Sequence, residues 1–333
     1  MTTGFQMTPQ AKHWVEKALE RYGPPDFAHV ASAVFWTDER DASGELLVEA
    51  DPTALVASHH RDPAVLLQGH DPGRPVGQVL EVAAFVTPEG RHFVAGIVGY
   101  YGRDGAMTFA ELGLANVDMG QWLELDVLPS DDRIELAADP RDLPDGWLDE
   151  VMSDAPPTTV RVEMSYNAAE TTQELIRIAL AFGALWNPFV KAIATEAGKD
   201  VYGATRDWIK AVLARSRRLK SPAISLEGYY RGCHVSFLIR GTNPATHAAA
   251  YEGLTEAAVE AATLVARLEA RGMPPTGLVY EFDEAAGRWY PSYARLASGR
   301  IIVDSPMLIA TLQDLPKGLS LGMRKVDMGK PRK

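Results

Sequence analysis

The feature that most constrains the fold is an abrupt change of sequence pattern at the Ala-Pro-Pro segment of residues 155–157. Before it, short apolar runs rich in β-forming residues alternate with turns, and after it, long helical patterns alternate with short strands. A chain of 333 residues is long enough for two domains. We therefore predict an α+β protein with a β-rich domain over residues 1–154 and an α/β domain over residues 155–298. Residues 299–333 then read as a strand, a short helix and a strand that can complete the first domain.

The first domain reads as a set of short strands after one amphipathic helix that begins at Thr8-Pro9. Strands are predicted over residues 27–36 and 76–82, and Thr-Pro-Glu-Gly at residues 87–90 is typical of a hairpin turn. This pattern predicts a partly closed barrel.

The second domain combines strands with long, well-capped helices. Asn243-Pro244 supplies an N-cap and a first helical residue, and Gly272 ends the helix that follows. The predicted elements are a strand over 158–164, an apolar helix over 170–186, a second helix from 187 to about 219, a hairpin over 223–239, a helix over 244–271 and a hairpin over 278–296. Their β-α-β-β-α-β order predicts a ferredoxin-like sandwich.

Composition limits the partners and the compartment. The formal charge of -11 disfavours nucleic acid as a partner, because such a role needs an extended basic surface. The single cysteine, Cys233, rules out an internal disulfide and indicates a reducing compartment. The N-terminus lacks the pattern of a signal peptide, so we expect a cytoplasmic protein. The most apolar window, residues 176–194, is interrupted by polar residues and is too short to span a membrane.

One stretch, residues 63–80, carries the only candidate for chemistry. An apolar run leads to Gln-Gly-His-Asp at residues 68–71, a turn follows at residues 72–75, and a second apolar strand begins at Val76. A histidine at the end of a strand that immediately reverses is held in a fixed place, which a general base requires. His70 is therefore a candidate base, and Asp71 is its nearest candidate orienting carboxylate.

This stretch resembles the histidine-bearing segment of the phage prohead maturation proteases, relatives of the herpesvirus assemblin proteases. The matching residues are an apolar pair, the His-Asp dipeptide and a following Pro-Val-Gly, namely Leu66, Leu67, His70, Asp71, Pro75, Val76 and Gly77. The segment Gly-Leu-Ser-Leu-Gly-Met at residues 318–323 is similar to the family's nucleophile strand and places Ser320 in the nucleophile position. The resemblance implies a serine endopeptidase of capsid maturation, with the α/β domain inserted between base and nucleophile.

The residues leave two functions open. In the first, Ser320 is activated by His70, and Asp71, Asp118 or Asp126 orients the imidazole, so that the protein is an active or degenerate serine endopeptidase acting on a protein substrate. In the second, the β-rich domain is a scaffold, and the apolar helices bind a protein partner without catalysis. The sequence predicts no cofactor, because its glycine-rich segment lacks the context of a phosphate-binding loop. It also predicts no metal, because His59, His60, His70 and Asp71 lack a second spaced pair of ligands.

Overall fold

The computed structural model describes residues 7–24, 26–40, 44, 46, 50–61, 63–114, 133–163, 174–180 and 196–309. Contacts divide the chain into two compact units. Of the described residues, the first unit holds those up to Gln68, Arg74–Ala106 and Ile309, and the second holds Gly69–Gly73 and Met107–Leu308. This division lies near residue 106, whereas the change of sequence pattern predicted one near residue 154. The reason is that the strand over residues 134–138 pairs within the larger sheet.

The first unit is built around an antiparallel sheet of four strands in the order β1-β4-β3-β2. Its elements are α1 (Pro9–Arg21), β1 (His29–Thr37), α2 (Pro52–Arg61), β2 (Val65–Leu67), β3 (Pro75–Val86), β4 (His92–Tyr100) and the 3-10 turn η2 (Arg103–Gly105). The sheet is open, and the described residues of this unit form no closed barrel. The predicted first helix is confirmed, with Thr8 as its N-cap accepting a hydrogen bond from the amide of Ala11.

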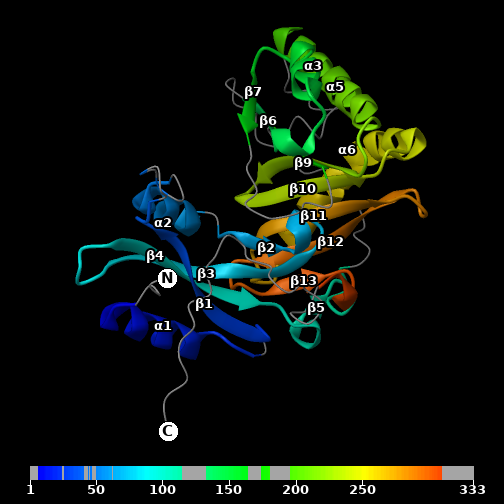
Figure 1. The fold of residues 1–333 in the computed structure, drawn as a ribbon. Coiled ribbons are helices and arrows are strands. Elements are labelled where there is room, and N and C mark those ends of the chain that lie inside the picture. Colours follow the sequence, from blue (N-terminus) through cyan, green and yellow to red (C-terminus); the bar gives the residue numbers. More distant parts are fainter. Residues whose placement is uncertain are drawn as a thin grey trace. The chain divides into compact units, whose positions relative to one another are not determined.

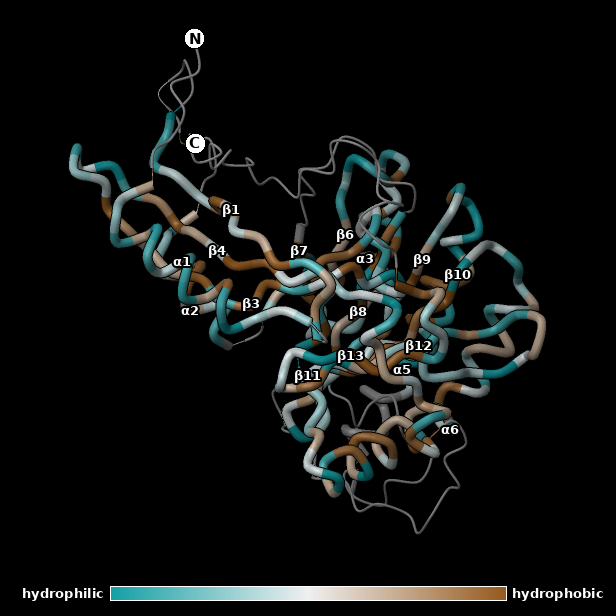
Figure 2. Tube along the Cα trace, turned by 90° about the horizontal axis from the view of Figure 1, so that it is seen from below, coloured by the Kyte–Doolittle hydropathy of each residue, from teal (hydrophilic) through white to brown (hydrophobic). Residues whose placement is uncertain are grey.

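Strand β4 is the core of the first unit. It lies between β1 and β3, and its residues from Phe93 to Gly99 are all buried. Phe93 and Ile97 belong to the apolar cluster that contains α1, whereas Val94 and Val98 belong to the cluster on the other face with residues of α2. Because both faces are covered, β4 reads as a continuous apolar run, which Figure 2 shows in brown.

The second unit contains a mixed sheet of nine strands in the order β5-β13-β12-β11-β10-β9-β8-β6-β7. Its strands are β5 (Met107–Thr108), β6 (Ile134–Ala138), β7 (Thr159–Glu163), β8 (Glu174–Ala179), β9 (Pro222–Tyr230), β10 (Cys233–Arg240), β11 (Pro275–Asp283), β12 (Arg288–Leu296) and β13 (Ile301–Val303). Its helices are α3 (Trp147–Ser153), α5 (Glu196–Ser216) and α6 (Pro244–Ala270), with 3-10 turns η3 (Pro140–Asp142) and η4 (Pro306–Leu308). A further 3-10 turn, η1 (Gln68–His70), follows β2.

The helices of the second unit pack on one face of its sheet, as Figure 1 shows for α3, α5 and α6. Residues that alternate along the strands, such as Val235 and Phe237 of β10, join them in one large apolar core. The opposite face of the same strands carries a polar series that includes Glu227, Ser236 and Glu281, all of them buried. Period-two alternation therefore separates an apolar face under the helices from a face of buried polar groups.

The strand order differs from that of the predicted ferredoxin-like sandwich. The β-α-β-β-α-β succession is present, but β8 lies beside β9 as a parallel pair and β10 lies beside β11 as another. An antiparallel β9–β10 hairpin joins the two pairs. A split β-α-β arrangement needs a third strand between the two parallel strands, and here there is none. The middle of the sheet therefore consists of two adjacent β-α-β repeats, β8-α5-β9 and β10-α6-β11.

One predicted element has the wrong type. Residues 174–179, expected within an apolar helix, form strand β8 between β9 and β6. Leu175, Ile176 and Ile178 are all buried, so the strand is apolar on both faces. A short apolar run of this kind does not distinguish a buried strand from a buried helix by periodicity. Among the described helices, none is long and apolar enough to cross a membrane.

Candidate functional site

The residues predicted from sequence to carry chemistry have different positions in the structure. His70 is the last residue of η1, after Gly69 at a φ of 56°, where glycine is favoured. Asp71 follows and is 9% exposed. Ser320, Asp118 and Asp126 lie outside the described residues. The pairing of His70 with Ser320, and the serine endopeptidase function that depends on it, stay predictions.

Asp71 belongs to a buried charged cluster on the polar face of the large sheet. The Arg240 guanidinium donates to both oxygens of Asp71, at 2.6 and 3.0 Å, and its Nε donates to Glu281 Oε2 at 2.9 Å. Ser292 Oγ donates to the other Glu281 oxygen at 2.7 Å. We call Asp71, Arg240, Glu281 and Ser292 the Arg240 cluster. It ties the turn that follows His70 to strands β10, β11 and β12.

The electrostatics of the Arg240 cluster favour its charged form. Burial disfavours the positive charge of Arg240, but the hydrogen bonds and charges of Asp71 and Glu281 outweigh burial and raise the pKa of the guanidinium above its usual range. Gly73 donates its amide to Asp71 Oδ1 at 2.9 Å. A Cβ atom on Gly73 would lie 2.4 Å from both Arg240 Nη2 and Glu281 Oε1, so only glycine fits there. The three charges and the turn therefore form one packed structure.

A second buried cluster surrounds Glu227 on the same face of the sheet. Arg177 donates to both carboxylate oxygens, at 2.8 and 2.5 Å, and Ser225 Oγ donates at 2.8 Å. His234 Nε2 lies 3.2 Å from Glu227 Oε2, and its ring lies 5.0 Å from that of Tyr229. Burial raises the pKa of Glu227, but hydrogen bonds from His234 and Arg177 outweigh it and lower this pKa to about 2. Glu227 is thus a permanent anion at neutral pH.

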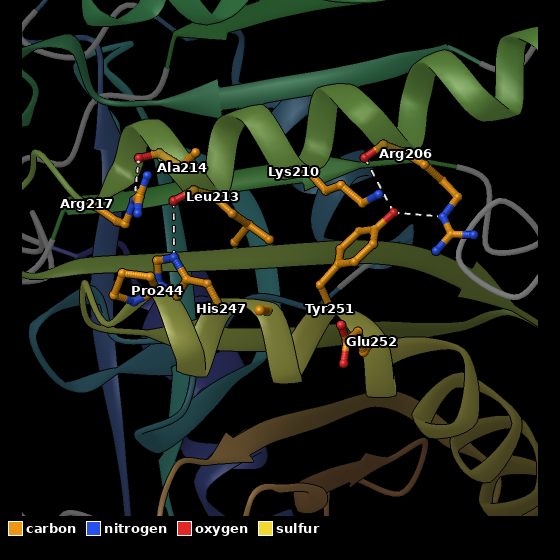
Figure 3. A pocket seen from close by; sticks show the side chains of 10 residues that line it. Arg206, Lys210, Leu213, Ala214, Arg217, Pro244, His247, Tyr251 and Glu252 are labelled. Carbon is orange, nitrogen blue, oxygen red and sulfur yellow. Dashed lines mark hydrogen bonds between the residues drawn. The ribbon is translucent and has the colours of Figure 1, made fainter.

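Helices α5 and α6 form a pocket of about 350 Å³ between them, which we call the α5–α6 pocket (Figure 3). Its lining residues recur about once per helical turn along each helix, singly or as adjacent pairs, as expected for residues that share a face. They are Arg206, Lys210, Leu213, Ala214 and Arg217 from α5 and the residue after it, and Pro244, His247, Ala248, Tyr251 and Glu252 from α6. The pocket therefore lies along the line where the two helices face each other.

Tyr251 is the centre of one end of the pocket. Its hydroxyl accepts a hydrogen bond from Arg206 Nε at 2.7 Å and donates to the Arg206 carbonyl at 3.4 Å. The Arg206 guanidinium and the Lys210 ammonium each lie 5.3 Å from the centroid of its ring. Figure 3 shows the Tyr251 hydroxyl between these two side chains. Tyr251 therefore holds two cations at defined positions.

His247 occupies the floor near the other end. It is 4% exposed, and its Nδ1 lies 3.1 Å from the Leu213 carbonyl while its Nε2 lies 2.8 Å from the Gly241 carbonyl. Both ring nitrogens are engaged by backbone oxygens, so this histidine ties α5 to the start of α6. Arg217, at the same end, donates from Nε to the Ala214 carbonyl at 3.0 Å. The ring has no nitrogen left for a bound molecule.

The pocket is positively charged in a chain that is negative overall. Arg206, Lys210 and Arg217 face it, whereas Glu252 is its single carboxylate. Lys210 also lies 3.7 Å from Asp207, an exposed pair on α5 that contributes little. Three cations and one anion contrast with the formal charge of -11 for the whole chain. The pocket can therefore attract an anionic group.

The sequence predicts the helix that carries these cations but does not reveal the pocket. Thr205, Trp208 and Val212 form the buried face of α5. The spacing of Arg206, Lys210 and Arg217 on the neighbouring stripe was an available signal. This spacing indicates a pocket only once the facing helix is known to be α6.

No family model, curated protein or solved structure matches this chain. Among the described residues, no group of three or more histidine, cysteine, aspartate or glutamate side chains is arranged to hold a metal ion. The geometry of the pocket and its charge are therefore the basis for assigning a function.

Proposed function

We propose that this protein is a non-catalytic partner-binding protein and that its α5–α6 pocket receives an anionic segment of a protein partner. One observation carries the proposal. Arg206 and Lys210 of α5, and Arg217 directly after it, face a pocket with an apolar and aromatic floor. A concave apolar surface with a few fixed charges is the usual form of a recognition site.

Electrostatics supports an anionic ligand. A local positive region on a chain of charge -11 attracts anions, while the rest of the surface repels them. The attraction is therefore confined to a small part of the molecule, which favours specific binding and fast association over tight non-specific binding. An extended nucleic-acid surface would need more cations than the pocket offers.

The chemistry of the pocket supports binding over catalysis. A general base needs a ring nitrogen or carboxylate that can reach the reacting proton. Both nitrogens of His247 are engaged by backbone carbonyls, and Glu252 is exposed on the rim. The Tyr251 hydroxyl is hydrogen-bonded to Arg206. The described pocket residues thus supply positioned charges and no nucleophile–base pair.

The test is a binding assay on the full chain with a fluorescein-labelled oligoglutamate peptide as the probe. Fluorescence anisotropy should show saturable binding that weakens as salt is added. Lys210→Gln and Arg217→Gln should each weaken it about fivefold, as expected for the loss of one partly exposed charge contact. An oligoglutamine peptide of the same length should not bind.

Arg218→Gln is the matched control. It removes the same charge from the residue next to Arg217, but Arg218 pairs with Glu150 and does not line the pocket. Its affinity for oligoglutamate should equal that of the unmodified protein. Equal weakening by Arg217→Gln and Arg218→Gln would mean that the probe senses overall charge, and the proposed pocket function would be rejected.

A further inference from the structure

We infer that the occupant of the α5–α6 pocket is an extended protein segment of seven residues. Its first, third and seventh residues are acidic, and its fifth residue is apolar. This inference rests on the proposed function and adds the identity of the ligand. Its basis is the order of cationic and apolar groups along α5 and the residue after it, namely Arg206, Lys210, Leu213 with Ala214, and Arg217.

The backbone positions of the three cations lie in a row, with Arg206 and Lys210 both beside Tyr251 at one end of the pocket and Arg217 at the other. At a rise of about 1.5 Å per residue, Lys210 lies about 6 Å along the helix from Arg206, and Arg217 lies about 16 Å from Arg206. A compact anion such as inorganic phosphate can touch one end of this row. A peptide that extends along the α5–α6 pocket can contact all three cations.

The spacing of the row fits an extended peptide. Side chains on one face of an extended chain repeat about every 6.6 Å, because each residue advances about 3.3 Å. Acidic residues at the first and third positions therefore match Arg206 and Lys210. A seventh residue lies about 20 Å from the first, within about 4 Å of the backbone position of Arg217 along the pocket.

The middle of the α5–α6 pocket favours an apolar residue of the bound segment. Leu213 and Ala214 lie between Lys210 and Arg217 along the chain, Pro244 and Ala248 line the facing side of the pocket, and the buried Leu213 forms part of the floor. The fifth position of the same extended segment lies about 13 Å from the first, opposite this apolar surface. Burying an acidic residue there without a partner would be unfavourable, so the surface discriminates against a continuous acidic run.

Two further features set the affinity and its limits. Arg206 is held by its hydrogen bond to Tyr251, so little side-chain freedom is lost when a carboxylate binds. Glu252 lies on the α6 side of the same pocket and repels an acidic ligand. Glu252→Gln should therefore strengthen binding of the acidic segment, whereas Lys210→Gln weakens it.

The experiment compares two labelled peptides of equal composition on the full chain. The spaced peptide is Glu-Ala-Glu-Ala-Leu-Ala-Glu, and the clustered peptide is Ala-Leu-Ala-Ala-Glu-Glu-Glu. The spaced peptide should bind about tenfold more tightly, since it alone places an acidic residue at each end of the row and leucine between them. Arg217→Gln should reduce this preference and Arg218→Gln should leave it unchanged.

Other outcomes separate this inference from the proposed function. Equal affinity for both peptides, with both weakened by Lys210→Gln, would overturn the spaced segment and leave an anion-binding pocket. Full competition by inorganic phosphate would do the same. Tighter binding of a single-stranded oligothymidylate than of the spaced peptide would replace the protein partner with nucleic acid. No binding by any of these probes would refute the proposed function itself.

Discussion

Replacing Arg240 with methionine should strongly destabilise the second unit. The guanidinium pairs with both Asp71 and Glu281, whose side chains are 12% and 6% exposed. Methionine has a similar length but removes the cation that these two buried carboxylates of like charge share. Breaking a buried pair by removing one partner destabilises by about 3–5 kcal/mol. Because the Arg240 side chain itself is 26% exposed, we expect about 3 kcal/mol.

Urea unfolding followed by tryptophan fluorescence measures this loss, since Trp208 and Trp289 are buried in the same unit. With a slope of about 2 kcal/mol per molar urea, the midpoint should fall by about 1.5 M. Arg161→Met is the control, because Arg161 pairs with Asp149, whose side chain is 80% exposed, and such a surface pair contributes under about 1 kcal/mol. The double variant Arg240→Met with Glu281→Gln should recover part of the loss. Equal midpoints for Arg240→Met and Arg161→Met would refute the reasoning.

Two further predictions concern Glu227 and the histidine-bearing turn. The folded pKa of Glu227, about 2, lies below its ordinary value of 4.5, so it contributes stability above pH 4.5 that is lost as the pH falls towards 2. This contribution is about 3 kcal/mol, and a series of unfolding measurements against pH should be flatter over that interval for Glu227→Gln. If the protein is a serine endopeptidase, a serine-reactive phosphonate should label the unmodified chain, while Ser320→Ala and His70→Ala should both escape labelling. Labelling of Ser320→Ala to the same extent would remove Ser320 from that mechanism.

Local signals were sufficient for the elements that end in unambiguous caps. Helix α6 begins at Pro244 after the Asn243 cap and ends before Gly272, as the sequence predicts. The hairpin of β11 and β12 was also predicted, and it is confirmed. Here the residues that begin and end each element are neighbours in sequence, so their preferences alone set the boundaries.

Prediction failed where the outcome depends on distant residues. The run of residues 174–179 becomes a strand because β9 and β6 flank it, and its apolar pattern carries no information about those neighbours. The Arg240 cluster joins residues from a turn and three strands, and the α5–α6 pocket joins two helices that are separated by a hairpin. In both cases the individual residue types look like ordinary surface charges until tertiary pairing brings them together.

The ion pair between Asp71 and Arg240 also limits how early this part of the chain can fold during synthesis. The two residues are 169 positions apart, so a ribosome adding about 5–20 residues per second makes the Asp71 turn about 8–34 s before its arginine. Until then, the carboxylate must remain in water, and the turn cannot take its final place. The pairing of strand β5 is delayed still longer, because its parallel partner β13 begins only at Ile301. During both delays the nascent chain exposes a strand or turn whose partner has not yet been made. A chaperone would be most useful to the chain in this period.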